Sequence, residues 1–177
     1  TIRSGLNRLI ISVDGADQQT YADYRVGGQL EKVKAGIRNL VNWRNELGSR
    51  EPYIILQVLV FHSNEHQLDE IRQLGISLGV DEVKFKTAQI YDLKNGIRRL
   101  PSDPRHSRYR KEKNGNYAIS NGMANHCWRM WSSGVVTWDG DMVPCCLDKD
   151  ASHVMGNLTN DPLDELWHGR RYQAFRD

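Results

Sequence analysis

The chain has 177 residues, of which 39% are hydrophobic, and a formal net charge of +2. This length allows one or two small domains with a working core, and so small a charge is no argument for nucleic-acid binding. Three cysteines are too few for a secreted disulfide scaffold, and the sequence has neither a signal-peptide pattern nor an apolar run long enough to span a membrane. We therefore expect a soluble, cytoplasmic protein that makes no membrane contact.

The first part of the chain alternates predicted strands with predicted helices. Residues 9–13 form an apolar, β-branched run that ends at Asp14-Gly15, which indicates a buried strand followed by a loop. Residues 16–28 are expected to form a short helix and a glycine-rich turn. Apolar residues at 3.6-residue spacing then predict an amphipathic helix over residues 30–47.

A second unit repeats this order. Residues 53–61 read as a strand, Asn64 is the predicted N-cap in the loop that follows, and apolar residues from Leu68 to Leu78 mark the next helix. Alternating apolar and charged residues predict a third strand over residues 81–90. This order predicts an α/β fold with a parallel sheet and right-handed crossovers, in which three strands are too few to close a barrel.

Residues 91–120 have the composition of a linker, with two prolines, an Asn-Gly pair and a basic run over residues 98–113. A nucleic-acid surface is the alternative, because Tyr109 interrupts the basic run. We favour a solvated linker and expect no nucleic-acid partner, since such runs are usually solvated faces.

All three cysteines lie in one short stretch, Cys127-x12-Gly140-x4-Cys145 followed directly by Cys146. Asp139-Gly140 between two apolar runs predicts a hairpin with a type I′ turn, which needs positive φ at both central residues. The hairpin would bring the cysteine pair back towards Cys127. Thiolates gathered in this way suit zinc or iron–sulfur centres and do not suit calcium or magnesium.

Other interpretations of the cysteines remain open. Cys127 and Cys145 would form a disulfide in an oxidising compartment, and unpaired cysteines can also be inert core residues. If the cysteines bind metal, the fourth ligand is His126, His153 or Asp148, or it comes from outside this chain, since the sequence has no fourth cysteine. The tryptophans near the site, Trp128, Trp131 and Trp138, would shield it or form the core of a small domain, and we expect core.

The residues after the cysteines extend the pattern. Cys127, Gly140-x4-Cys145 and Cys146-Leu147-Asp148 precede Gly156-Asn157-Leu158, then Leu163 to Trp167 and a closing Arg176. As a set these residues resemble the SPASM or twitch extension of radical SAM enzymes. The resemblance implies auxiliary [4Fe-4S] clusters beside a partial (β/α)6 TIM-like barrel that binds S-adenosylmethionine.

The family pattern also contains an N-terminal CxxxCxxC and further downstream cysteines, which this sequence lacks. The resemblance therefore implies a fragment of a larger enzyme. It divides the chain into residues 1–91, the C-terminal half of the barrel; residues 92–120, a basic linker; and residues 121–177, a truncated SPASM/twitch-like domain with a β-hairpin and a helix.

The same resemblance assigns candidate residues for S-adenosylmethionine. Ser12 and Asp14 map to the barrel mouth near the methionyl or ribose part, Arg25 to a basic position suited to the carboxylate, and Gln57 to a polar position on the next strand. Each also has a structural interpretation: Asp14 as a helix cap, Arg25 as a surface charge and Gln57 as a partner for a backbone group.

The parent protein is accordingly expected to be a radical SAM oxidoreductase or maturase that uses a 5′-deoxyadenosyl radical. Its substrate would be a peptide, a protein or a small molecule, and its electron donor a flavodoxin or a ferredoxin. The chain alone is expected to be inactive, because the cysteines for the catalytic cluster are absent. The alternative is a non-catalytic zinc-binding or electron-transfer α/β module that binds a peptide or protein partner.

Adjacent residues in an extended segment point to opposite faces, so Cys145 and Cys146 are not expected to serve one cluster together. We expect Cys127 and Cys145 to share a metal site, and Cys146 to face a second cluster or the core.

Overall fold

The computed structural model describes residues 1–120 and 127–177, with only the backbone of residues 93 and 94. The chain divides into two compact units, residues 1–122 and 123–177, called here the N-terminal and C-terminal units. The three segments expected from the sequence, residues 1–91, 92–120 and 121–177, stay a prediction. Among the described helices, none is long and apolar enough to cross a membrane.

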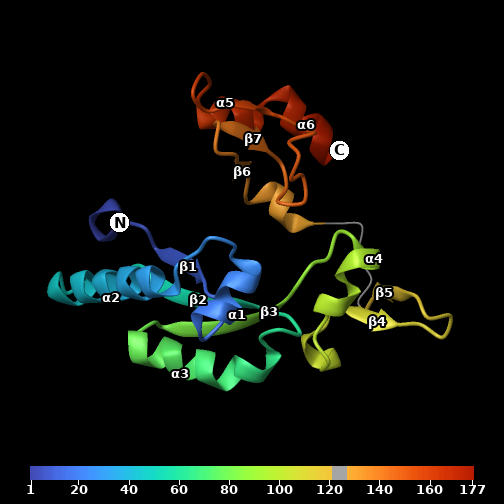
Figure 1. Ribbon diagram of the computed structural model, residues 1–177. Coiled ribbons are helices and arrows are strands. Elements are labelled where there is room, and N and C mark those ends of the chain that lie inside the picture. Colours follow the sequence, from blue (N-terminus) through green and yellow to red (C-terminus); the bar gives the residue numbers. More distant parts are fainter. Residues whose placement is uncertain (121–126) are drawn as a thin grey trace. The chain divides into compact units, whose positions relative to one another are not determined.

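The N-terminal unit is built on a parallel three-stranded sheet in the order β1-β2-β3 (Figure 1). Its strands are β1 (Arg8–Ser12), β2 (Tyr53–Val60) and β3 (Glu82–Thr87), and its main helices are α1 (Gln18–Tyr24), α2 (Leu30–Glu46) and α3 (Leu68–Leu78). The α/β class and the parallel sheet predicted from the sequence are thereby confirmed. The third strand ends earlier than expected, at Thr87, because Thr87 pairs with Val60 and β2 extends no further.

The core of this unit lies between the sheet and its helices. Alternate residues of β2, namely Ile54, Leu56 and Val58, are fully buried and share one cluster with Ile37 of α2 and Ile71 of α3. Because side chains alternate along a strand, Ser12 and Gln57 lie on the opposite face of the sheet. Lys84 is the register partner of Gln57, so these three polar residues form a row across that face.

The helix boundaries follow from local side-chain chemistry. Asp17 begins α1, since its Oδ1 accepts the Thr20 N–H at 2.8 Å, and Gln18 Oε1 accepts the Leu30 N–H at the start of α2. Gly79, with φ of 74°, ends α3 in the left-handed conformation. Asn64 occupies the N-cap position of a short 3₁₀ turn, as predicted, but its side chain makes no capping hydrogen bond there.

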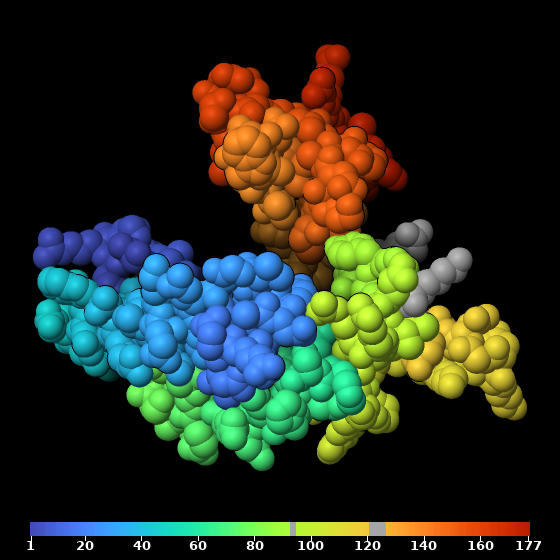
Figure 2. Space-filling model, in the orientation of Figure 1, coloured from blue at the N-terminus to red at the C-terminus, as the bar shows by residue number. Residues whose placement is uncertain are grey.

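Residues 91–120 carry short elements of their own and contact the rest of the N-terminal unit. They contain α4 (Leu93–Gly96) and a hairpin of β4 (Tyr109–Lys111) with β5 (Tyr117–Ile119), which Figure 2 shows projecting from that unit in yellow. The buried Tyr109 hydroxyl donates to the Ile90 carbonyl and accepts the Ile90 N–H. Glu65 accepts the N–H groups of Ser102 and Asp103.

The C-terminal unit is an antiparallel three-stranded sheet with two short helices. Its strands are β6 (Val135–Val136), β7 (Asp141–Val143) and β8 (Gly156–Asn157), and its helices are α5 (Leu163–His168) and α6 (Arg170–Arg176). The single helix that the resemblance implied for this unit is interrupted at Gly169, whose ψ of 160° is extended rather than helical. Short 3₁₀ turns complete the described elements: η1 (Ile2–Ser4), η2 (Glu65–Gln67), η3 (Ile97–Arg99), η4 (Pro104–His106) and η5 (Trp128–Trp131).

The small core of this unit consists of Met142, Met155 and Tyr172, with Leu166 and Phe175 packed against them. The expectation that tryptophans 128, 131 and 138 form this core is wrong, since their exposed fractions are 71%, 59% and 96%. Met142, Met155 and Tyr172 form the core instead, and the side chains of these three tryptophans are exposed to solvent.

Candidate metal centre

The cysteines lie in the segments that precede and follow the β6–β7 hairpin. Cys127 comes immediately before η5, and its carbonyl accepts the Met130 N–H at 3.2 Å. Cys145 and Cys146 follow β7, and the Cys145 carbonyl accepts the Asp148 N–H at 3.1 Å. The hairpin therefore lies between the two cysteine-bearing segments in the sequence. Its strands pair Val135 with Val143.

The hairpin is confirmed, but its predicted type I′ turn is wrong. Gly140 has a φ of 92°, whereas Asp139 is not among the described residues with positive φ. Thr137 donates its N–H to the Asp141 carbonyl and accepts the Gly140 N–H, which leaves a three-residue loop. Three-residue hairpin loops commonly contain a glycine with positive φ, and Gly140 is that residue in this loop.

Gly140 and Asn157 fix the turn together. Asn157 donates its side-chain amide to the Asp139 carbonyl at 3.0 Å and to Asp141 Oδ1 at 2.9 Å. A Cβ on Gly140 would lie only 2.9 Å from Asn157 Oδ1, so the glycine is required by its φ and by this close approach. A Cβ on Gly156 would similarly meet Leu166 at 2.3 Å. These motif residues hold the strand that leads to Cys145.

All three thiols are free, with Cys127 and Cys146 exposed and Cys145 half-buried. The Leu147 N–H donates to Cys145 Sγ at 3.4 Å. Within residues 1–120 and 127–177, no group of three or more His, Cys, Asp or Glu side chains is arranged to hold a metal ion. The sharing of one site by Cys127 and Cys145, and a separate role for Cys146, stay predictions.

Two of the proposed additional ligands already have partners. Both carboxylate oxygens of Asp148 accept backbone N–H groups, from Ser152 and His153, each at 2.8 Å. Burial alone would raise the pKa of Asp148, but these hydrogen bonds outweigh it and lower the pKa overall. The His153 ring packs edge-on against Phe175 at 5.3 Å. The third candidate, His126, lies outside the described residues.

Arg176 connects the last helix to the segment after Cys127. Its Nε donates to the Met130 carbonyl at 2.9 Å and its Nη1 to the Trp167 carbonyl at 3.1 Å. The guanidinium carbon is 4.0 Å from the ring centre of Tyr172 and 4.2 Å from that of Trp167. These hydrogen bonds and ring contacts connect η5, α5 and α6 to one another.

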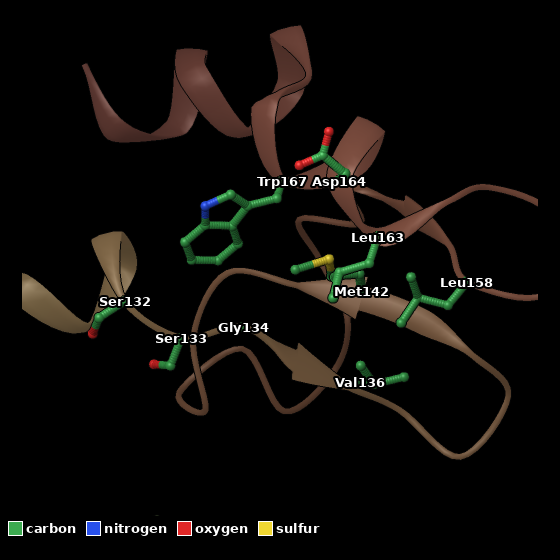
Figure 3. A pocket seen from close by; sticks show the side chains of 9 residues that line it. All are labelled: Ser132, Ser133, Gly134, Val136, Met142, Leu158, Leu163, Asp164 and Trp167. Carbon is green, nitrogen blue, oxygen red and sulfur yellow. The ribbon is translucent and has the colours of Figure 1, made fainter.

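An open cavity of about 610 Å³ lies in the same unit. Figure 3 shows the residues that line it, and the Met142 and Trp167 side chains lie close to Gly134. None of the three cysteines lines this cavity. Its mainly apolar lining suits an apolar group rather than a metal ion.

A second candidate site lies where the parallel strands of the N-terminal unit end. The buried Asp14 accepts the Leu59 N–H at Oδ1 and donation from Arg25 Nε at Oδ2, both at 2.6 Å. Its backbone carbonyl accepts the Asn64 side-chain amide at 3.0 Å. Asp14 therefore joins the loops after β1 and β2 and orients Arg25. The interpretation of Asp14 as a helix cap is wrong, because Asp17 is the N-cap of α1.

The other two candidates lie beside this cluster. Ser12 and Gln57 are register partners on β1 and β2, and both are half-buried. Gln57 is in turn the register partner of Lys84 on β3, so a polar row crosses the three strands. Arg25 keeps 35% of its side chain exposed. Sequence reasoning missed Asn64 as the brace of this site, because its pattern indicated only a cap.

Residues 127–177 match the family model SPASM, described as an iron-sulfur cluster-binding domain. Residues 127–177 are therefore similar to SPASM domains. This match confirms the SPASM part of the resemblance that the cysteine spacing and the later motif residues indicated.

A curated relative is the "Tungsten-containing aldehyde ferredoxin oxidoreductase cofactor-modifying protein" of Pyrococcus furiosus, 26% identical over 176 residues. The match covers 85% of this chain and 48% of the relative, so the chain spans about half the length of that protein. A solved structure, BtrN in an open conformation, is 14% identical, with 97% of this chain and 84% of that chain covered. Its TM-score of 0.34 does not establish a shared fold.

Proposed function

We propose that this chain is part of a radical SAM oxidoreductase or maturase, in which the SPASM domain binds an auxiliary [4Fe-4S] cluster. The observation that carries the proposal is the SPASM match, which begins at Cys127 and includes all three free thiols. In the same proposal, β1 to β3 and their helices form half of a partial (β/α)6 barrel.

The donor chemistry of the C-terminal unit fits an iron–sulfur group in kind. Thiolates are the usual ligands of such clusters, and Cys145 Sγ already accepts one backbone N–H, the type of bond that tunes a cluster's reduction potential. The chain's three cysteines supply at most three ligands of a four-thiolate cluster. We assign Cys127 and Cys145 to one cluster and Cys146 to a second cluster or to a structural role. A bound auxiliary cluster would supply one-electron chemistry.

For the strand-end site we propose binding of S-adenosylmethionine. Arg25 is the residue suited to the carboxylate of the ligand, because Asp14 holds its Nε while 35% of the Arg25 side chain stays exposed. Ser12 and Gln57 would contact the ribose or methionyl part from the face of the sheet that they share. Asp14 acts mainly through Arg25, since both of its carboxylate oxygens are engaged within the chain.

The reaction class is proposed from the relative's name, which describes modification of an enzyme's cofactor. A protein of this type would act on a peptide, a protein or a small molecule and receive electrons from a flavodoxin or a ferredoxin. No feature of the described residues selects among these substrates.

The test is anaerobic purification of the whole protein, followed by iron and acid-labile sulfide analysis and incubation with S-adenosylmethionine and a chemical reductant. We expect iron, sulfide and reductant-dependent 5′-deoxyadenosine, and no 5′-deoxyadenosine from the 177-residue chain alone. Stoichiometric zinc without sulfide would instead support the alternative, a non-catalytic zinc module that binds a partner. Product formation by the isolated chain would contradict the predicted inactivity.

A further inference from the structure

β6 lies at one edge of the C-terminal sheet, whose strand order is β6-β7-β8. Thr137, directly after β6, donates its N–H to the Asp141 carbonyl at 2.9 Å, so these two residues form a hydrogen-bonded pair. Hydrogen-bonded and non-hydrogen-bonded pairs alternate along an antiparallel ladder, which makes Val136 and Met142 a non-hydrogen-bonded pair. The N–H and C=O of Val136 therefore point away from β7, towards the outer edge of the sheet.

The backbone of Met142 supports this assignment. Its carbonyl accepts the Met155 N–H at 2.8 Å, and Met155 directly precedes β8, so the carbonyl points away from β6. Within residues 1–120 and 127–177, no strand pairs with the outer edge of β6. β6 consists of two valines, so neither a charge nor a proline guards this edge. The edge thus offers one backbone donor and one backbone acceptor to an added strand.

The apolar cavity of about 610 Å³ lies on the same face of the sheet as the Val136 side chain. Val136 and Met142 are register partners, so their side chains share one face, and both line the cavity (Figure 3). Leu163 and Trp167 add to its apolar lining. A residue that exchanged both hydrogen bonds with Val136 would place its own side chain on this face. The edge and the cavity can therefore bind one extended ligand.

The lining of the cavity also carries a negative charge. Asp164 is one of the lining residues, and its side chain is 88% exposed. Its Oδ1 lies 3.1 Å from Nδ1 of His168, which is itself exposed. No lysine or arginine is among the described residues that line the cavity. A cationic side chain two positions along an added strand would lie on the same face and find an opposite charge there.

We propose that β6 and the cavity beside it bind an extended peptide segment of a partner protein, which adds to the sheet antiparallel to β6. A bulky apolar side chain of the segment occupies the cavity, and a lysine or arginine two residues away lies near Asp164. Strand addition takes its affinity from main-chain hydrogen bonds and its specificity from pockets for alternate side chains. The inference does not rest on the proposed iron–sulfur function, because none of the three cysteines lines the cavity.

The test measures binding of a fluorescein-labelled peptide, Thr-Lys-Thr-Leu-Thr-Lys-Thr, to the whole protein by fluorescence anisotropy. Leucine and both lysines share one face of this peptide when it is extended. One control peptide has aspartate in place of leucine. A second is N-methylated at the leucine nitrogen, which removes the hydrogen bond to the Val136 carbonyl. A third is N-methylated at the next threonine, whose N–H would point away from β6.

The protein variants are Val136→Pro and Leu163→Lys, with Leu147→Lys as the control. Proline removes the Val136 N–H, and an edge strand tolerates proline where that N–H faces outwards. Leu163 is 56% exposed and lines the cavity, whereas Leu147 is 52% exposed and does not line it. Amide hydrogen exchange at Val136 reports the proposed bond directly. The Val135 amide is the internal reference, because its hydrogen-bonded partner is Val143 of β7.

We expect the leucine peptide to bind and to slow exchange of the Val136 amide several-fold, with no change at Val135. The aspartate peptide, methylation at leucine, Val136→Pro and Leu163→Lys should each weaken binding by about tenfold. Methylation at threonine and Leu147→Lys should leave it unchanged.

Failure of the leucine peptide to bind, or equal binding of the two methylated peptides, would overturn the inference. If Val136→Pro does not fold, the methylated peptides decide on the wild-type protein. Protection of the Val136 amide without peptide, rising with protein concentration, would overturn the inference in favour of a second copy of this chain as the occupant.

Discussion

The strand-end site of the N-terminal unit and the cysteine hairpin of the C-terminal unit differ in how far their own chain completes them. Asp14 is 1% exposed and has a partner at each carboxylate oxygen and at its backbone carbonyl. The cysteines are free, two of them exposed and one half-buried. The hydrogen bond described for these thiols is the one from the Leu147 N–H to Cys145 Sγ. The groups around Asp14 are therefore held together by bonds within the chain to a greater extent than the three thiols are.

This difference predicts where substitutions act. Changes at the strand-end site should reduce the stability of the fold, because its polar groups hold loops together. Changes at the cysteines should remove a bound group and leave the fold largely intact, because the exposed thiols contribute little packing.

The largest effect is expected for the cysteines. In the whole protein purified anaerobically, Cys127→Ser and Cys145→Ser should each lose one cluster, about four iron atoms per chain. Cys146→Ser is the matched variant, since it changes the neighbouring thiol, and it should keep the signal of that cluster. Iron and sulfide analysis with electron paramagnetic resonance measures the result. Loss of the same signal in Cys145→Ser and Cys146→Ser would show that the neighbours serve one cluster.

The next effect is expected at Asp14. Asp14→Ala leaves the Leu59 N–H without its acceptor and Arg25 without its ion pair, so we expect a loss of about 2–4 kcal/mol in the free energy of unfolding. Asp69→Ala removes an exposed ion pair with Arg72 and should change stability by less than about 0.5 kcal/mol. Chemical denaturation of both variants measures the difference. Equal stabilities would show that Asp14 is not the brace inferred here.

A smaller loss is expected at the hairpin turn. Gly140→Ala combines a φ of 92° with a contact of 2.9 Å to Asn157 Oδ1, and it should destabilise the C-terminal unit by about 1–3 kcal/mol. Gly115→Ala is the control for positive φ alone, because Gly115 has a φ of 85° and nothing within 4 Å of a built Cβ. Gly115 lies in the N-terminal unit, so far-UV circular dichroism measures unfolding of that variant. Tryptophan fluorescence measures unfolding of the C-terminal unit, which holds four of the five tryptophans: 128, 131, 138 and 167. If the two alanine variants lose equal stability, the contact with Asn157 contributes nothing.

The sequence predicted the parallel sheet of the N-terminal unit because each strand and helix there carries its own periodic apolar pattern. Ile54, Leu56 and Val58 alternate along β2, and Ile37 and Val41 follow the spacing of a helix, so burial could be inferred locally. The early end of β3 could not be inferred locally, because it depends on where the neighbouring strand β2 ends.

The C-terminal unit was less predictable because its elements are too short for periodicity. Three tryptophans that composition assigned to a core are exposed, while Met142, Met155 and Tyr172 fill it. The cysteine spacing indicated a metal-binding segment, but the outward backbone groups of Val136 depend on how the strands pair. Asn64 shows the same limit in the N-terminal unit, since a residue with the pattern of a cap instead joins Asp14 to β2.

The smallest effect concerns acid sensitivity of the N-terminal unit, through Asp81. Its Oδ2 accepts the Ile54 N–H at 2.7 Å and a hydrogen bond from Arg44 Nη1. Burial alone would raise the pKa of Asp81, but these bonds outweigh it and lower the pKa below its ordinary value of 3.8. Because the folded pKa is the lower one, the stabilisation is complete above the ordinary value and is lost as the pH falls through the folded pKa.

Asp81→Asn should therefore reduce stability at neutral pH and unfold with a weaker dependence on pH below about 4. Asp69→Asn is the control, since Asp69 lies on the exposed face of α3 and its pair with Arg72 is open to solvent. Amide hydrogen exchange at Ile54, measured from pH 7 down to the acid transition, reports the bond directly. If the Asn variant kept the full acid dependence of the wild type, the acid sensitivity of this unit would have to come from a carboxylate other than Asp81.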